Sequence, residues 1–304
     1  MKYPQVWFLS WLCILGICGL AACHETATKT VSSISTKTVM DSTTVRPVSS
    51  SLALVSDNRL ERQVLAGAWL NVTYTDALRQ SHSPRKAHGH WGASGLTELL
   101  LYARNPMSDS LRVNILYGNH ESIPPSFIIA KPGTKVFSVH ASVEGDAVDM
   151  KLRYKAGQTD TLLYVEERDA KTHRITSTAF RKLSGFVVKS DTLETPLAYF
   201  INQLDFAGTH LMIDSTGHTS VVRFTPIGRV YGWPASRTYQ VNMDFTGPFH
   251  ELNSVFIDIY QENQREFVFG VNGDTIRFYR MHDDTITYKR QRGCLCYTLI
   301  WKGK

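Results

Sequence analysis

Short apolar runs separated by Gly, Asn, Asp and Pro fill the chain after Asn58, a pattern typical of strands and turns. In the run Met150–Lys155, apolar residues alternate with lysine and arginine, so one strand face is apolar and the other is charged. Runs of the same kind are Leu111–Tyr117, Lys135–His140, Thr161–Glu166, Val255–Tyr260, Glu266–Val271, Thr275–Met281 and Cys294–Trp301. Strands with one apolar and one polar face are typical of antiparallel sheets. The pattern therefore predicts an all-β, mostly antiparallel fold.

Two segments have helical character, Arg59–Leu65 and Thr195–Leu204, and no others are expected to be helical. In the second segment Pro196 occupies a first-turn position, where a helix tolerates proline. A similar stretch follows each segment, Leu65–Trp69 in one case and Phe206–His210 in the other, and each stretch leads into an apolar run. The chain therefore contains a candidate internal repeat.

The downstream ends of the two halves also correspond, because Asp160–Tyr164 is echoed by Asp274–Phe278. We therefore expect two β modules, residues 59–187 and residues 188–304. Composition permits this, since the hydrophobic content is ordinary for a globular protein. Both small barrels and packed β-sandwiches would produce the observed alternation of apolar and polar residues.

Gly67-Ala68-Trp69, directly after the first helical segment, resembles the start of the bacterial lipocalin-like (calycin) lipoproteins. Barrels of that family begin with a short helix and a Gly-x-Trp on the first strand. The resemblance implies two antiparallel barrels, with Gly67 and Trp69 closing the floor of the first. In the second half His210 replaces the tryptophan, so we expect the motif to have lapsed there and His210 to be less completely buried. Packed sandwiches are the alternative.

The first 22 residues have the character of a secretion signal, with one early cation, Lys2, and an uncharged run over Val6–Ala22. The run ends in Leu20-Ala21-Ala22-Cys23, which resembles the lipobox of bacterial lipoproteins. That resemblance implies cleavage before Cys23 and attachment of diacylglycerol and palmitate-type acyl chains to its thiol, and more than one acyl chain anchors a protein stably. An uncleaved membrane anchor is the alternative.

Residues 23–58 are expected to form a lipidated tether without a fold, because about half of the residues from His24 to Ser51 are Ser or Thr. Within it, Asp41-Ser42-Thr43 resembles the acceptor triplet for general O-glycosylation of exported Bacteroidetes proteins. The resemblance implies a glycan on Ser42. Asp in a turn before a β-branched residue gives the same triplet, so ordinary tether sequence is the alternative.

The formal net charge of +6 is spread along the chain, and the sequence has no basic block. Such a distribution argues against nucleic acid as a partner. After removal of a signal and lipidation of Cys23, Cys294 and Cys296 are the cysteines left. We interpret them as free, inward-facing thiols, with a strained or redox-active pair and metal ligands as alternatives, because a Cys-x-Cys without partner ligands is a weak zinc signal.

His82, His88 and His90 fall within the polar stretch Ser81–Trp91, and they are weak candidates for a metal or haem site. No carboxylate or cysteine completes a ligand set nearby in the sequence, so an exposed loop is the alternative. The sequence contains no nucleophile elbow, phosphate loop or zinc-protease pair. We therefore expect no catalytic residues, no metal and no cofactor.

These patterns predict a non-enzymatic cell-envelope lipoprotein that binds a hydrophobic or amphipathic ligand. The rival hypothesis is a scaffold or interaction subunit of an outer-membrane assembly with an envelope protein as partner, and a third is a hydrolase of envelope glycans. His24 after the lipid cysteine is not an aspartate of the inner-membrane retention type, which favours the outer membrane, with the periplasmic and surface faces both open. Small inward side chains around a cavity would favour ligand binding, whereas large ones filling it would favour the scaffold.

Overall fold

The computed structural model describes residues 64–303 with gaps at 93–94, 103–109, 119–120, 130–135, 144–145, 157–160, 170, 188–194, 246–250 and 285–288. Cys23, Ser42, the signal and the tether therefore lie outside the described residues. Of the predicted helix Arg59–Leu65, only Val64 and Leu65 are described, and both are helical.

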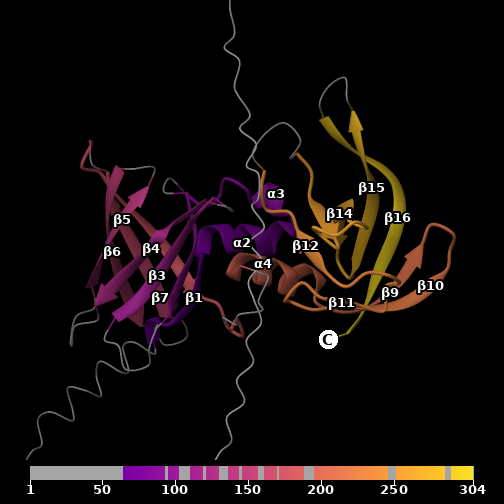
Figure 1. Ribbon diagram of the computed structural model, residues 1–304, viewed down its shortest axis with the longest axis horizontal. Helices are drawn as coiled ribbons and strands as arrows, with labels where there is room; N and C mark the ends of the chain where they lie inside the picture. The colour runs from indigo at the N-terminus through magenta and orange to yellow at the C-terminus, as the bar shows by residue number, and fades with distance from the viewer. Residues whose placement is uncertain are drawn as a thin grey trace, which may run out of the picture. The chain divides into compact units, whose positions relative to one another are not determined.

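The first module is an eight-stranded antiparallel meander (Figure 1). Its strands are β1 (Gly67–Asn71), β2 (Leu96–Tyr102), β3 (Ser110–Tyr117), β4 (Glu121–Ile129), β5 (Val136–Val143), β6 (Asp146–Ala156), β7 (Thr161–Arg168) and β8 (Ile175–Lys182). Their order across the sheet is β4-β3-β2-β1-β8-β7-β6-β5, so the first and last strands are paired at the centre. The two edge strands, β4 and β5, also contact each other, which curls the sheet round its apolar face.

The second module repeats this plan with β9 (Gly208–Asp214), β10 (Thr219–Phe224), β11 (Val230–Tyr231), β12 (Tyr239–Val241), β13 (Ser254–Ile257), β14 (Arg265–Asn272), β15 (Thr275–Asp284) and β16 (Lys289–Gly303). The order is β11-β10-β9-β16-β15-β14-β13-β12. A bridge between Arg229 and Thr238 joins the two edges, and the Tyr239 amide donates to the Gly228 carbonyl at 2.9 Å. The all-β, two-module prediction is confirmed, and both halves have the same circular strand order.

Each meander encloses a core of inward-facing residues. In β3, for example, Leu111, Val113 and Ile115 are fully buried while the residues between them are partly exposed. Equivalent inward residues of the first module are Leu99, Leu101, Phe137, Val139, Met150, Leu152, Leu163, Val165 and Phe180. The alternation of Met150–Lys155 thus places its lysine and arginine side chains on the outer face, as predicted.

The connection from β1 to β2 contains two helices, α2 (Val72–Ser81) and α3 (Pro84–Ala87), so the prediction of only two helical segments is wrong. The first turn of α2 is rich in β-branched and aromatic residues, which have low helix propensity. The helix forms there because the Asn71 side chain caps it, accepting from the Tyr74 amide at 3.1 Å, and because Tyr74 and Leu78 are fully buried.

The predicted helix Thr195–Leu204 is present as α4 (Pro196–Ile201), continued by the π-helix η1 (Asn202–Phe206). Thr195 is the N-cap, and its hydroxyl accepts from the Ala198 amide at 3.2 Å. The residues of α4 pack in the second core, and Tyr74, Leu78 and Ala87 from the first half join that same core. The second module is therefore built partly from helices that precede β2 in the chain.

The strand predictions agree with the structure to within a few residues. One predicted strand is too long at its C-terminal end. The predicted strand Val255–Tyr260 ends at Ile257, because Asp258 and Tyr260 have φ angles of 54° and 63°, which no strand accommodates. Strand β4 contains Pro124 and Pro125 and lies at an edge of its sheet, where missing amide donors cost least.

Candidate functional site

Gly67 and Trp69, the predicted floor-closing residues, lie on β1 at one end of the first barrel. The Trp69 side chain is fully buried, and its Nε1 donates to the Leu65 carbonyl at 2.8 Å. The Lys182 ammonium lies 5.7 Å from the Trp69 ring centroid and donates to the Val64 carbonyl at 2.8 Å. Gly67 has φ 133°, and a Cβ there would lie 2.9 Å from Lys182 Cε. Only glycine fits this position comfortably.

The second module repeats this arrangement with His210 in place of the tryptophan. Its Nε2 donates to the Phe206 carbonyl at 2.8 Å, again four residues earlier, and the side chain is fully buried. The expectation that His210 is less completely buried is therefore wrong, because the ring fills the same floor position and burial lowers its pKa. Gly208 takes the role of Gly67 with φ 147°, and Trp301 packs on His210 at 5.4 Å.

The three candidate metal-binding histidines lie in three different environments. His82 is the C-cap of α2, and its Nδ1 lies 2.6 Å from Oδ1 of the buried Asp205 in η1. His88 packs edge-on against Trp91 at 4.4 Å and Phe245 at 5.3 Å, and burial lowers its pKa. His90 is exposed. Within the described part of the chain, no group of three His, Cys, Asp or Glu residues is placed to hold a metal ion.

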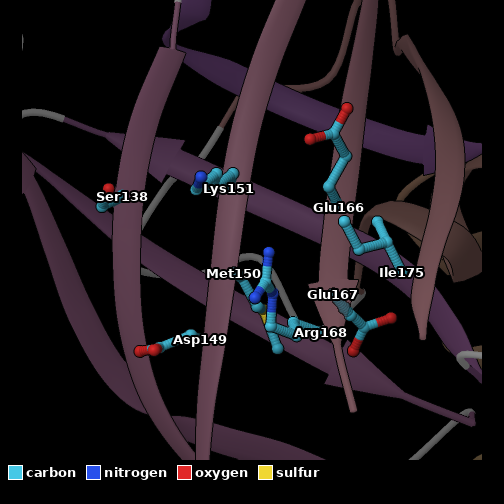
Figure 2. Close-up of a pocket in the computed structure, with 8 residues that line it drawn as sticks. All are labelled: Ser138, Asp149, Met150, Lys151, Glu166, Glu167, Arg168 and Ile175. Atoms are coloured by element: carbon cyan, nitrogen blue, oxygen red, sulfur yellow. The ribbon is translucent and has the colours of Figure 1, made fainter. Parts of the chain in front are cut away.

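Charged side chains alternate along the outer face of β6 and β7, and we call this surface the strand face: Asp149, Lys151, Arg153, Lys155, Glu166 and Arg168. Figure 2 shows Asp149, Lys151, Glu166 and Arg168 among them. One hollow on it, of about 360 Å³, is lined by Ser138, Asp149, Met150, Lys151, Glu166, Glu167, Arg168 and Ile175. Lys151 and Glu166 lie opposite each other on paired strands, and Arg153 forms an ion pair with Glu166 at 3.2 Å. Ile175 is an exposed apolar residue at its rim. The strand face carries exposed charged side chains of both signs, which suits contact with a charged macromolecular surface.

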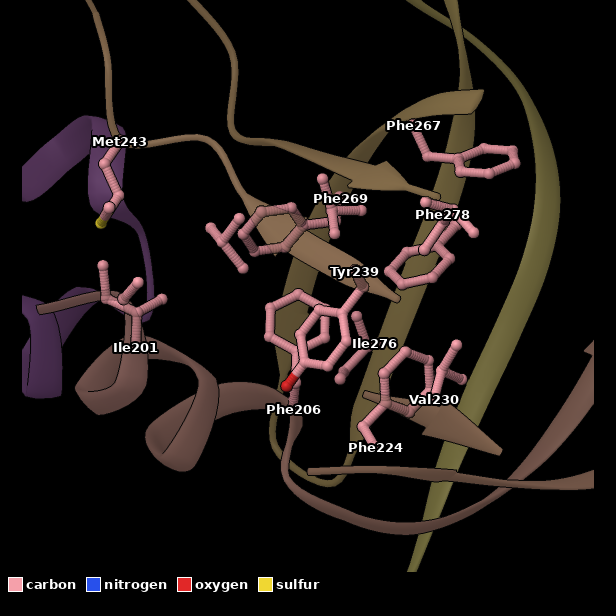
Figure 3. Packing of buried hydrophobic residues seen from close by; sticks show 14 of the residues in the cluster. Ile201, Phe206, Phe224, Val230, Tyr239, Met243, Phe267, Phe269, Ile276 and Phe278 are labelled. Atoms are coloured by element: carbon pink, nitrogen blue, oxygen red, sulfur yellow. The ribbon is translucent and has the colours of Figure 1, made fainter. Parts of the chain in front are cut away.

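The interior of the second barrel is filled by aromatic rings (Figure 3). Phe206, carried in by η1, is fully buried, with its ring centroid 5.1 Å from that of Phe269 and 5.5 Å from that of Tyr239. Phe224 and Phe278 complete the cluster at 6.1 and 6.2 Å from Phe206. The floor and middle of this barrel are therefore occupied by its own side chains.

The opposite end of the second barrel is hollow. We call this cavity of about 460 Å³ the mouth hollow, and it is lined by Asp214, Ser215, Arg265, Glu266, Phe267, Arg280, Cys296 and Tyr297. These residues come from the adjacent strands β9, β16, β15 and β14 and from the turn after β9. Strand register pairs Phe267 with Arg280 and Tyr297 with Asp214, whereas His210 and Trp301 pair at the floor end.

Aromatic rings form the wall beneath the mouth hollow. Trp233 lies 5.0 Å from Tyr297 and 6.2 Å from Phe267, measured between ring centroids. Phe267 and Tyr297 are 5.7 Å apart at a steep angle, and Phe278 lies 5.8 Å from Phe267. Such contacts between rings stabilise the wall.

Two arginines stand over this wall. Arg265 lies 5.3 Å above the Trp233 ring and donates through Nη2 to the Ser236 hydroxyl. Arg280 contacts the Cys296 thiol, whose pKa is raised mainly by burial, so the thiol is neutral near pH 7. Among the described residues Arg280 forms no ion pair.

The carboxylates beside the mouth hollow are engaged elsewhere. Glu266 accepts from Arg290 Nη1 at 2.9 Å. Asp214 Oδ1 accepts from the Thr216 hydroxyl at 2.7 Å, the Thr216 amide at 2.8 Å and the His218 amide at 3.0 Å. The Thr216 hydroxyl is the main reason that the pKa of Asp214 lies below its ordinary value.

Cys294 and Cys296 are both free, as predicted, but Cys294 is exposed, so the expectation that both point inward is wrong. The reason is a pair of register irregularities between β15 and β16, on either side of Tyr279. Bulges of this kind re-aim side chains and are common beside binding sites. The pattern of apolar and polar residues does not indicate these bulges. The mouth hollow could therefore not be predicted from the sequence.

The two barrels differ at the mouth end. In the second, a turn at residues 215–218 joins β9 to β10, whereas in the first the helices α2 and α3 take that place. There Tyr117 donates to Glu167 Oε1 at 2.6 Å, and the pKa of Tyr117 is raised by burial and by that carboxylate.

Comparison with protein-family models, curated proteins and solved structures found no match to this chain. Among the described residues, no helix is long and apolar enough to cross a membrane.

Proposed function

We propose that this protein is a non-enzymatic cell-envelope lipoprotein that binds a hydrophobic or amphipathic small molecule in the mouth hollow. The observation that carries the proposal is an open cavity of about 460 Å³ with an aromatic wall and two guanidinium groups. Ligand pockets typically measure about 300–1,000 Å³ and occur, among other places, in the mouths of β-barrels. The mouth hollow has this size and position, and its mostly polar lining includes the aromatic residues Phe267 and Tyr297.

The barrel interiors are less suitable for a ligand than the mouth. Phe206, Phe224, Tyr239, Phe269 and Phe278 fill the second interior, and the first is filled by residues such as Trp69, Phe137 and Phe180. A ligand there would have to displace packed side chains, whereas the mouth hollow is already formed. The proposed ligand therefore rests on the aromatic wall and does not enter the barrel.

The anchoring part of the proposal rests on Leu20-Ala21-Ala22-Cys23 and the Ser/Thr-rich stretch after it. Acyl chains on Cys23 would hold the protein on the outer membrane, and the tether would let the barrels stand away from it. Whether they face the periplasm or the cell surface is open in this proposal.

A scaffold role in an envelope assembly is the second candidate, and the filled interiors of both barrels together with the strand face favour it. Lys151, Arg153 and Lys155 are exposed along β6, with Arg168 beside them on β7. These four cations outnumber Asp149 and Glu166 on the same face, so an acidic protein surface is the partner that the face would suit.

The two candidates are separated by blocking the mouth hollow. We expect wild-type protein extracted gently from membranes to carry a small molecule that native mass spectrometry detects. Cys296→Trp would fill the hollow and abolish that mass, whereas Cys294→Trp, whose side chain is not part of the lining, would retain it. Thermal unfolding of both variants checks that the fold persists.

The absence of a bound molecule in the wild type, or equal retention in the two tryptophan variants, would contradict binding at the mouth hollow. In either case, cross-linking of the wild type to an envelope protein, lost when Lys151 and Arg153 are changed to Glu, would favour the scaffold instead.

A further inference from the structure

We propose that the mouth hollow selects a planar organic anion, whose charged group pairs with Arg280 while its ring lies on the wall of Phe267 and Tyr297. This inference rests on the proposed function and narrows it to a ligand class: an aromatic or similarly flat body carrying a carboxylate, phosphate or sulfate group.

Arg280 supplies a positive charge at the mouth hollow. It lines the hollow, it is exposed, and it forms no ion pair among the described residues. Its close neighbour Cys296 is a neutral thiol and therefore leaves the positive charge uncompensated. A guanidinium in this state is a ready partner for an oxyanion, because two of its N–H groups match two anionic oxygens.

The nearby carboxylates have partners other than Arg280, although the neutral donors around Asp214 leave its negative charge in place. Glu266 is in an ion pair with Arg290, and Asp214 is held by three donors of its own turn. Arg265 lies on the same side of the hollow, but its position is fixed by Ser236 and the Trp233 ring, and its charge is partly offset by Asp258. The hollow therefore presents an available cation beside carboxylates that already have partners.

The aromatic wall of the hollow favours a flat ligand. Strand register puts Phe267 directly opposite Arg280, so a ring resting near Phe267 has its substituent within reach of the guanidinium. Beneath Phe267, the buried Phe278 and Trp233 close the way down. A long flexible chain would find no channel to enter, whereas a flat ring covers the wall and loses little conformational entropy.

The probes for this inference are naphthoate and its neutral isostere naphthamide, titrated calorimetrically into the intact protein. We expect naphthoate to bind more tightly than naphthamide to the wild type. Arg280→Gln should weaken naphthoate binding about tenfold, the scale of one lost charge-assisted pair, and leave naphthamide unchanged. Arg277→Gln is the matched control, because Arg277 lies on the same strand but outside the lining of the hollow.

The possible results distinguish failure of the proposed anion class from failure of ligand binding at the mouth hollow. If naphthamide binds as tightly as naphthoate, or if Arg277→Gln and Arg280→Gln act equally, the anion class is wrong while binding at the mouth stands. If neither probe binds at millimolar concentration, and no molecule copurifies with the wild type, both proposals fail. Inorganic phosphate competing as well as naphthoate would also overturn the inference, because the ring would then contribute nothing.

Discussion

The ring nitrogens of Trp69 and His210 each donate to the carbonyl of the residue four positions earlier. Each follows a glycine with positive φ by two residues, and each lies against a residue of its last strand, Lys182 or Trp301. Both modules therefore begin in the same way. A glycine with positive φ follows a short helical segment, and a buried ring on the first strand hydrogen-bonds back to that segment. The sequence shows the glycine and the tryptophan, but it does not show that histidine performs the same task.

Substitution of these rings should destabilise the protein. Trp69→Ala should cost about 3–5 kcal/mol, the usual range for a buried large aromatic residue. His210→Ala should cost about 1–3 kcal/mol, because the buried Phe206 carbonyl loses its donor. Denaturant unfolding of the full chain measures both, since the second core contains helices of the first half. Losses below about 0.5 kcal/mol at both sites, a surface-like effect, would refute the floor role.

We also predict that Ser42 carries an O-linked glycan. If the tether is glycosylated at Asp41-Ser42-Thr43, Ser42→Ala should lower the mass of the mature protein by one glycan. Intact-protein mass spectrometry of material from the native host is the measurement, with Ser49→Ala as control in the same tether. An unchanged glycan mass would mean that Ser42 is not glycosylated and that the triplet is ordinary tether sequence.

Glu98 on β2 is a buried carboxyl group that holds the start of helix α4. Its Oε2 accepts from the Leu197 amide at 2.8 Å, at the start of α4. Burial raises the pKa of Glu98 to about 7, and its hydrogen bonds to the Leu197 amide and the Thr195 side chain oppose that rise. Because the folded state holds the proton more tightly than the unfolded state, Glu98 favours folding most at acid pH.

The contribution of Glu98 to stability should therefore fall by about 3 kcal/mol as pH rises from about 4.5 to about 7 and level off above that. His88 and His210, whose pKa values burial lowers, contribute a change of opposite sign, so the Glu98 effect is the difference between wild type and Glu98→Gln. Glu98→Gln keeps an acceptor for the Leu197 amide without the charge, so it should remove this part of the slope and stabilise the protein at pH 8. Urea unfolding at several pH values tests it, with exposed Glu262→Gln as control. A slope identical in wild type and Glu98→Gln would refute the role of this carboxyl.

Helices α2 and α3 are the elements that the sequence pattern did not predict. The stretch Val72–Thr75 has the residues of a strand, and its helical state depends on the Asn71 cap and on burial of Tyr74 and Leu78 in the second core. Tertiary contacts of this kind are invisible to periodicity. Strands with clean alternation, such as β3 and β6, were predictable because one face is buried along their whole length.

For the whole molecule, the internal repeat was readable in the sequence and the mouth hollow was not. Repeated turn and helix signals predicted two modules, and the two sheets have the same circular strand order. The hollow depends on Asp214, Phe267, Arg280 and Cys296, which come from four different strands, and on bulges beside Tyr279. Its residues become neighbours only through strand register, which local sequence does not specify.

Membrane attachment is a prediction about the whole chain. Cys23→Ala should abolish labelling by palmitate and release the protein from membranes, while both β modules remain folded, because the described fold begins beyond the tether. Membrane fractionation and circular dichroism measure the two effects. Palmitate in the variant, or none in the wild type, would remove the lipoprotein hypothesis.

A crystal structure of protein purified from its own membrane would show whether the second barrel binds its ligand at the mouth or in its interior. We expect electron density for a flat molecule against Phe267 and Tyr297, with its charged group on Arg280 and the interior ring cluster undisturbed. Density for a molecule among Phe206, Phe224 and Phe278, or an occupied strand face beside an empty mouth, would contradict it.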